Sequence, residues 1–181
     1  ANRASYPRTG TIITNTISNQ NGTFHGSPTF QNNFNGVIDF DGTDDYIDTN
    51  FNTDSDYISF IFWAYRDAGV NDGTYLSRWG IGSNWSIIVR EDSSNNLKIQ
   101  FQCSNGNAIA NADMSLSTGD WNCYAATFDG TIVRIYKNGI QITTEDLDGV
   151  LKTSTPDLFI GDRSTLSQSP FNGQLGPVQV Y

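Results

Sequence analysis

The clearest alternation of apolar and polar residues lies between residues 119 and 144. Two turn-forming dipeptides, Asp129-Gly130 and Asn138-Gly139, divide this stretch into three segments rich in β-branched and aromatic residues. Such dipeptides favour two-residue turns with positive φ between antiparallel strands. The pattern predicts a meander of three strands over residues 121–128, 131–137 and 140–144.

Tight turns at both dipeptides would fix the strand register, and with it the face on which each side chain lies. The pairs predicted on an apolar face are Phe128 with Thr131, Ala126 with Val133, Tyr124 with Ile135, and Ile142 with Ile135. The opposite face has mixed polarity and consists of Cys123, Ala125, Thr127, Ile132, Arg134, Tyr136, Gln141 and Thr143. One face therefore belongs to a core, and the other is solvated or holds a ligand. A bulge in a hairpin would turn every side chain beyond it to the other face.

Short apolar segments separated by turn residues continue along the rest of the chain. The longest apolar run, residues 57–65, predicts a central strand buried on both faces. Further strands are expected near residues 12–13, 23–25, 36–40, 45–48, 74–79, 85–90, 97–103, 107–110, 157–161 and 176–181. No segment has the pattern of a helix longer than two turns. We therefore predict one all-β domain over residues 1–181, a two-sheet antiparallel β-sandwich.

The composition narrows the classes of partner. The 181-residue chain has a formal net charge of −9, and Glu91 and Glu145 are its only glutamates, so 17 of its 19 acidic residues are Asp. Nothing resembles a basic stripe that could neutralise phosphates, so we expect no nucleic-acid partner. No apolar run is long enough to span a bilayer, so we expect no membrane insertion. Cys103 and Cys123 are predicted on opposite faces of their strands, which argues against a disulfide.

The arrangement of acidic residues argues against catalysis. Glycoside hydrolysis needs two carboxylates that face one cleft, whereas Glu91 and Glu145 lie far apart in sequence. His25 is the only histidine, and no Gly-x-Ser-x-Gly motif accompanies any serine. We therefore expect no enzymatic activity, and a glycan-cleaving enzyme is the least favoured alternative.

Calcium is the metal that the residue types fit, because it takes carboxylate, amide and carbonyl oxygens as ligands. The candidate ligands are Asp39, Asp41, Asp44 and Asp45. Turn formation explains Asp at such positions equally well. We expect no required cofactor and retain calcium as an optional ligand.

Sugar binding needs aromatic rings for the apolar faces of pyranoses, together with planar amide or guanidinium donors for hydroxyl groups. The candidate ligand-binding residues are Trp63, Tyr65, Arg78, Trp79, Gln100, Gln102, Arg134, Tyr136 and Gln141. The same residue types also suit packing under loops or against a neighbouring chain. Both interpretations stay open on the pattern alone.

Five segments, residues 37–47, 58–63, 121–139, 158–161 and 171–181, follow one another in a distinctive order. Together they resemble the successive signatures of laminin-G-like modules of the concanavalin A-like lectin/glucanase superfamily. The resemblance implies a jelly roll of two curved antiparallel sheets, whose concave face or rim loops bind glycans in many relatives. Many relatives carry an acidic residue near the position of Gly176, and its absence weakens a transferred calcium site.

The opening segments, residues 4–7, 10–11, 21–23 and 27–30, are similar to the version of this module in structural proteins of tailed, especially marine, bacteriophages. This likeness implies a location on a virion or another extracellular surface, with other virion proteins as further partners. Relatives usually continue past the final Tyr and often begin a strand earlier. We therefore expect a module that is cut from, or resolved within, a longer protein.

These observations favour a non-enzymatic carbohydrate-binding or adhesion module. Its expected ligand is a cell-surface polysaccharide or a polysaccharide of algal or bacterial origin. The alternative is a purely structural decoration or oligomerisation domain of a virion.

Overall fold

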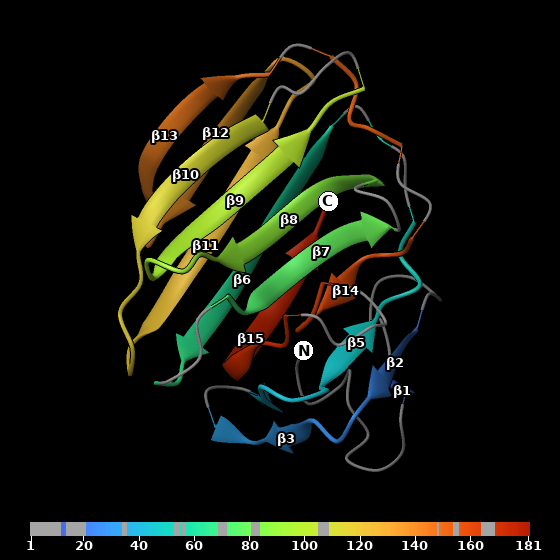
Figure 1. Ribbon diagram of the computed structural model, residues 1–181, viewed down its shortest axis with the longest axis vertical. Coiled ribbons are helices and arrows are strands. Elements are labelled where there is room, and N and C mark those ends of the chain that lie inside the picture. Colours follow the sequence, from blue (N-terminus) through green and yellow to red (C-terminus); the bar gives the residue numbers. More distant parts are fainter. Residues whose placement is uncertain are drawn as a thin grey trace.

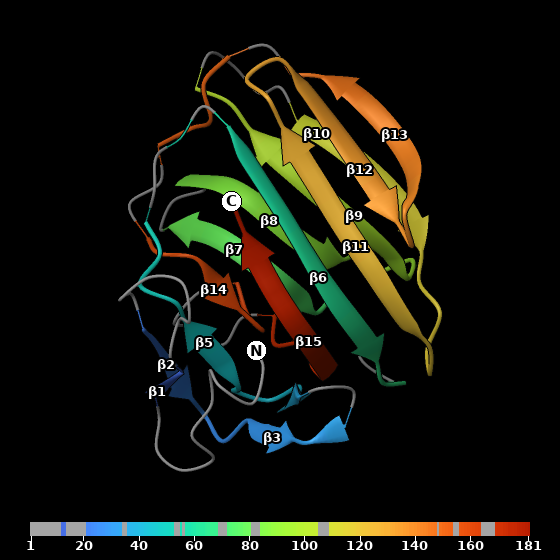
Figure 2. The same cartoon turned by 180° about the vertical axis from the view of Figure 1, so that it is seen from behind.

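The computed structural model describes residues 12–13, 21–33, 36–52, 55, 57–68, 72–80, 84–104, 109–147, 149–153, 156–163 and 169–181, with residues 84 and 109–113 as backbone only. The described residues form 15 β-strands and no α-helix. The strands make two antiparallel sheets that pack face to face (Figures 1 and 2). The predicted all-β sandwich is confirmed. The described part of the chain holds no helix with the length and apolarity that a membrane crossing needs.

The two sheets are built from segments that alternate along the chain. The eight-stranded sheet has the order β1 (Ile12–Ile13), β2 (Gly22–His25), β5 (Tyr46–Asp48), β14 (Phe159–Ile160), β7 (Thr74–Gly80), β8 (Asn84–Glu91), β9 (Asn96–Gln102) and β10 (Ile109–Ser115). The seven-stranded sheet has the order β13 (Ile140–Asp146), β12 (Ile132–Lys137), β11 (Trp121–Phe128), β6 (Ile58–Arg66), β15 (Asn172–Val180), β4 (Val37–Asp41) and β3 (Thr29–Gln31).

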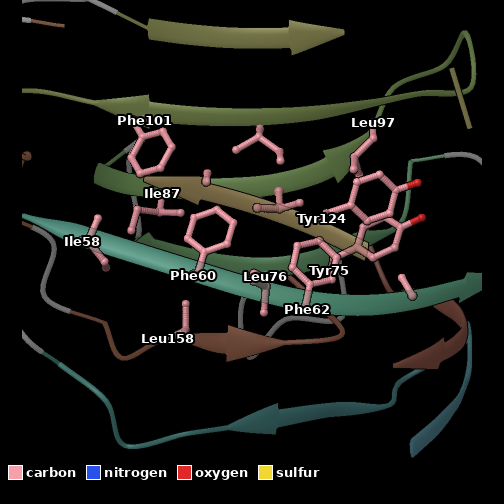
Figure 3. Packing of buried hydrophobic residues seen from close by; sticks show 14 of the residues in the cluster. Ile58, Phe60, Phe62, Tyr75, Leu76, Ile87, Leu97, Phe101, Tyr124 and Leu158 are labelled. Atoms are coloured by element: carbon pink, nitrogen blue, oxygen red, sulfur yellow. The ribbon is translucent and has the colours of Figure 1, made fainter. Parts of the chain in front are cut away.

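The hydrophobic core lies between the sheets and is rich in aromatic rings. Phe60 and Phe62 project from β6 toward rings of the other sheet, with the Phe62 ring centroid 5.8 Å from that of Tyr75 (Figure 3). Alternate residues of β6 face outward, and Trp63 is 44% exposed. The prediction that residues 57–65 are buried on both faces is therefore wrong. Its apolar run is continuous because aromatic residues occupy the outer face as well as the core face.

The β11–β12 hairpin has the predicted strands and faces but a different register. Phe128 pairs with Val133, and Ala126 pairs with Ile135. The turn is longer than two residues because the Asp129 carboxylate accepts hydrogen bonds from the backbone N–H groups of Thr131 and Ile132. The shift equals two residues, and side chains alternate with a period of two, so each side chain keeps its predicted face.

The β12–β13 hairpin contains a β-bulge that the pattern did not reveal. Ile135 pairs with Thr143, whereas the next pair is Tyr136 with Gln141, so Ile142 is the extra residue. Ile142 is 45% exposed, and the predicted Ile142–Ile135 pair is wrong. Thr143, predicted on the mixed face, lies instead on the face of Ile135. Cys103 and Cys123 are both free thiols, Cys103 in the core and Cys123 half-buried.

The turn between β4 and β5 carries the chain from one sheet to the other. Gly42 takes a positive φ of 74° in this turn. The buried carboxylate of Asp45 accepts hydrogen bonds from the backbone N–H of Ser27, at 2.6 Å, and from that of Asp41, at 3.0 Å. One side chain thus holds together the β2–β3 connection and the crossover.

Candidate functional site

The nine side chains predicted to bind sugar fall on different parts of the sandwich. Trp63, Tyr65, Arg134, Tyr136 and Gln141 come from β6, β12 and β13, all in the seven-stranded sheet. Gln100 and Gln102 come from β9 in the eight-stranded sheet, where they alternate with core residues. The two groups therefore belong to different layers of the sandwich (Figure 2), and Gln102 is buried. They do not form one common binding surface.

Arg78 and Trp79 lie on β7, in the same sheet as Gln100 and Gln102 and separated from β9 by β8. Arg78 is only 2% exposed, and its Nη2 donates a hydrogen bond to Asn52 Oδ1 at 2.7 Å. A guanidinium buried in this way stabilises the fold and has little surface to offer a ligand. Trp79 stacks on Trp85 with ring centroids 5.7 Å apart, and the Arg163 guanidinium lies 5.1 Å from the centre of the Trp79 ring.

Three aromatic side chains, Trp63, Tyr65 and Trp121, gather on the outer face of the seven-stranded sheet, and we call them the aromatic platform. Trp121 pairs with Tyr65 across β11 and β6, and their ring centroids are 5.7 Å apart. On the neighbouring β15, a Cβ at Gly176 would lie 3.0 Å from Trp63 Cβ and 3.8 Å from Trp121 Cζ3. The missing side chain leaves room for both indole rings. Trp121 was not predicted as a site residue, although its position alternates in step with Cys123 on the mixed face.

A row of polar side chains, Gln31, Asp39 and Gln174, borders the aromatic platform, and we call it the polar row. Tyr65 pairs with Gln174, and Gln174 pairs with Asp39 on the next strand. Gln31 Nε2 donates a 2.8 Å hydrogen bond to Asp39 Oδ2, and Gln174 Nε2 donates a 3.5 Å hydrogen bond to Gln31 Oε1. Sequence reasoning missed both glutamines, because nothing local shows that β3, β4 and β15 join β6 in one sheet.

The electrostatics of this face are dominated by carboxylates. Burial and the nearby Asp67 carboxylate raise the pKa of Asp39, against the lowering effect of hydrogen bonds from Gln31 and Gln174. Arg134 lies farther along the same outer face, where its Nη1 pairs with Asp129 Oδ2 at 2.7 Å. The face can therefore offer flat rings, amide groups and a carboxylate to a ligand.

Of the four predicted calcium ligands, the structure brings Asp41, Asp44 and Asp45 together. Their nearest carboxylate oxygens lie within 4.8 Å of one another, and Asp39 is not part of this group. Both oxygens of Asp45 already accept backbone hydrogen bonds, and Asp41 Oδ1 accepts one from the N–H of Thr43. The oxygen donors fit calcium chemically. The local backbone explains two of the three side chains without an ion.

The two glutamates do not form the paired acids of a glycosidase. Glu91 is buried at the end of β8, where its Oε1 accepts hydrogen bonds from Arg66 Nε at 2.9 Å and from the Tyr75 hydroxyl at 2.8 Å. Glu145 is exposed on β13, in the other sheet. The single histidine, His25, stacks on Tyr46 with ring centroids 4.3 Å apart.

The comparison with known proteins agrees with the β-sandwich architecture. A family model described as the concanavalin A-like lectin/glucanases superfamily, of laminin-G type, matches residues 41–181. The chain belongs to this superfamily. No curated protein sequence matches this concanavalin A-like domain at a significant level.

Solved structures show the same concanavalin A-like fold in proteins of distant sequence. Domain 4 of AbnA, a GH43 extracellular arabinanase from Geobacillus stearothermophilus solved with arabinotriose, has a TM-score of 0.73 at 14% identity, covering 93% of this chain and 85% of its own. The binding domain of botulinum neurotoxin serotype G has a TM-score of 0.69 at 14% identity, covering 91% and 44%. Mouse laminin α1 domains LG4-5 have a TM-score of 0.60 at 11% identity, covering 80% and 40%. The chain thus spans less than half the length of the neurotoxin and laminin chains.

Proposed function

We propose that this concanavalin A-like domain is a non-enzymatic carbohydrate-binding module that binds polysaccharide on the outer face of its seven-stranded sheet. The observation that carries the proposal is the 44% exposed Trp63 beside Tyr65, Trp121 and the polar row. Indole and phenol rings cover the apolar faces of sugar rings, while amide and carboxylate groups bind the hydroxyl groups. The face supplies both kinds of contact side by side.

Each such site binds a sugar weakly, because a shallow face buries little of the ligand. Display of many copies on a virion or another extracellular surface would convert weak contacts into strong adhesion. The neighbouring structures support a binding role, since Domain 4 of AbnA was solved with arabinotriose and the neurotoxin neighbours are named as binding domains. The separation of Glu91 from Glu145 supports a role without glycan cleavage.

The alternative, a structural decoration or oligomerisation domain, is favoured by one observation. Ile140 and Ile142 are exposed on β13, an edge strand of the seven-stranded sheet. A partner chain can bury exposed apolar residues of this kind by packing against the edge strand. Under this alternative the protein self-associates or binds a virion protein through this edge. Polysaccharide then does not bind the aromatic platform.

Polysaccharide binding tests the proposal directly. Single and multivalently displayed protein would be applied to a panel of algal and bacterial polysaccharides, with calcium and with a chelator. We expect binding to fall at least about tenfold in Trp63→Ala, because loss of a central aromatic contact costs about 2 kcal/mol or more and about 1.4 kcal/mol is already tenfold. The calcium and chelator arms report whether the Asp41 group contributes.

Tyr57→Ala is the matched control. Tyr57 is a 66% exposed aromatic just before β6, about 20 Å from Trp63 along the strand at its usual rise per residue. Binding should survive this change. A folded wild-type protein that binds nothing in either format would contradict the proposal, as would equal loss of binding in the two variants. Light scattering on the same samples would then decide for or against the oligomerisation alternative.

A further inference from the structure

The aromatic platform and the polar row form one line of side chains across the seven-stranded sheet. Trp121, Tyr65, Gln174 and Asp39 are successive cross-strand partners on β11, β6, β15 and β4. Adjacent strands lie about 4.8 Å apart, so the line extends about 14 Å. It begins with aromatic rings and ends with a carboxylate. A polysaccharide lying along it would contact groups of both kinds.

On the described strands of the seven-stranded sheet, the basic side chains are engaged away from this line. The described strands of the seven-stranded sheet carry three basic residues, Arg66, Arg134 and Lys137. Arg66 is buried and pairs with Glu91, and Arg134 pairs with Asp129 two cross-strand rows from Trp63. Lys137 lies 5.9 Å from the centre of the Tyr124 ring and donates to the carbonyl oxygen of Ser115.

Anions, in contrast, gather at the polar end of the line. Asp39 is half-buried there, and the Asp67 carboxylate is near enough to disfavour its ionisation. Asp120 directly precedes Trp121 at the other end and is exposed. A carboxylate or sulfate brought to this line would meet charges of its own sign, and the described strands of this sheet would offer it no cation. A neutral sugar instead offers hydroxyl groups that donate to the Asp39 carboxylate.

We propose that the line from Trp121 to Asp39 selects polysaccharides free of acidic groups, and excludes sulfated and uronic-acid polysaccharides. The proposal rests on the proposed function, since it assumes that polysaccharide binds at the aromatic platform. It adds a prediction about the charge of the ligand, because aromatic stacking alone does not distinguish neutral from acidic sugars.

Matched polymers that differ in charge alone test the selection. Dextran would be compared with dextran sulfate, and hydroxyethyl cellulose with carboxymethyl cellulose, at equal chain length. Any neutral polysaccharide that binds in the panel would be compared with its sulfated derivative in the same way. We expect each anionic member to bind at least about tenfold more weakly than its neutral partner at low salt. The difference should narrow in 0.5 M NaCl, where the Debye length falls to a few ångströms.

Asp39→Asn tests whether the Asp39 carboxylate causes the weaker binding of anionic polymers. It keeps the shape of the side chain and removes one charge, so binding of the anionic members should rise about threefold or more. Asp146→Asn, an equal charge change at an exposed position of β13, is the control and should leave the ratio unchanged. Anionic polymers that bind as tightly as neutral ones, with binding lost in Trp63→Ala, would overturn the selection while leaving the proposed function intact. Failure of every polymer to bind would instead remove the proposed function, and the selection with it.

Discussion

At the residue scale, the buried contact of Glu91 with Arg66 and Tyr75 links the two sheets and makes their association depend on pH. Burial raises the pKa of Glu91 above its ordinary value of 4.5, in spite of both hydrogen bonds. The folded protein therefore holds this proton at a pH where the unfolded chain has lost it. The contribution of Glu91 to stability is greatest below pH 4.5 and falls as the pH rises through its raised folded pKa.

Glu91→Gln tests this dependence, because glutamine cannot titrate. The free energy of unfolding would be measured by urea denaturation of both proteins between pH 4 and pH 8. We expect the advantage of the wild type over the variant to shrink as the pH rises. A difference that is constant across this range would show that the Glu91 pKa is the same in the folded and unfolded states.

Gly173 also acts at the residue scale, by allowing β15 to approach β6. Its φ is 141°, and a Cβ there would overlap with the backbone oxygen of Tyr65. Gly173→Ala should therefore lower the free energy of unfolding by about 2 kcal/mol or more, through strain and a clash that backbone atoms cannot relieve. Gly139, with a φ of 81° and open space around it, is the control.

Thermal or urea denaturation would compare Gly173→Ala with Gly139→Ala. The control should lose about 1 kcal/mol, which is the cost of the positive φ alone. Equal losses in the two variants would mean that β15 and β6 are not as close as described.

At the scale of the element, the β12–β13 bulge decides which isoleucine belongs to the core. Ile135 is fully buried, whereas Ile142 is the extra residue of the bulge and is exposed. Ile135→Ala should destabilise the protein by about 2 to 5 kcal/mol, because it leaves a cavity. Ile142→Ala should change stability by less than about 0.5 kcal/mol. Similar losses measured by urea denaturation would favour the bulge-free register instead.

The same hairpins show what a local pattern can predict. The strands and faces of β11 and β12 follow from alternation, and they survive a wrong turn length because the error is an even number of residues. The bulge in β13 shifts the pairing by one residue, which is an odd number. The side chains beyond it therefore lie on the face opposite to the predicted one. Its position depends on how the strand bends over the core, which no turn dipeptide encodes.

At the scale of the whole molecule, the sandwich follows from the sequence, but the assignment of strands to sheets does not. Asp45 holds a turn at which β4 and β5 part into different sheets, although they are neighbours in sequence. Alternation gives Gln100 and Trp63 as outward-facing residues without showing that they face opposite ways. For the same reason Trp121, Gln174 and Gln31, which come from three distant segments, could not be assembled into one site in advance.

The position of β15 has a consequence for biosynthesis. β15 lies between β6 and β4, so the seven-stranded sheet remains in two parts until that strand has left the ribosome. Pairs such as Ala64 with Leu175 join residues that are synthesised far apart in time. Sheets completed by distant segments fold slowly. During translation the nascent chain therefore exposes the edges of β6 and β4, and a chaperone that shields these edges would raise the yield of folded protein.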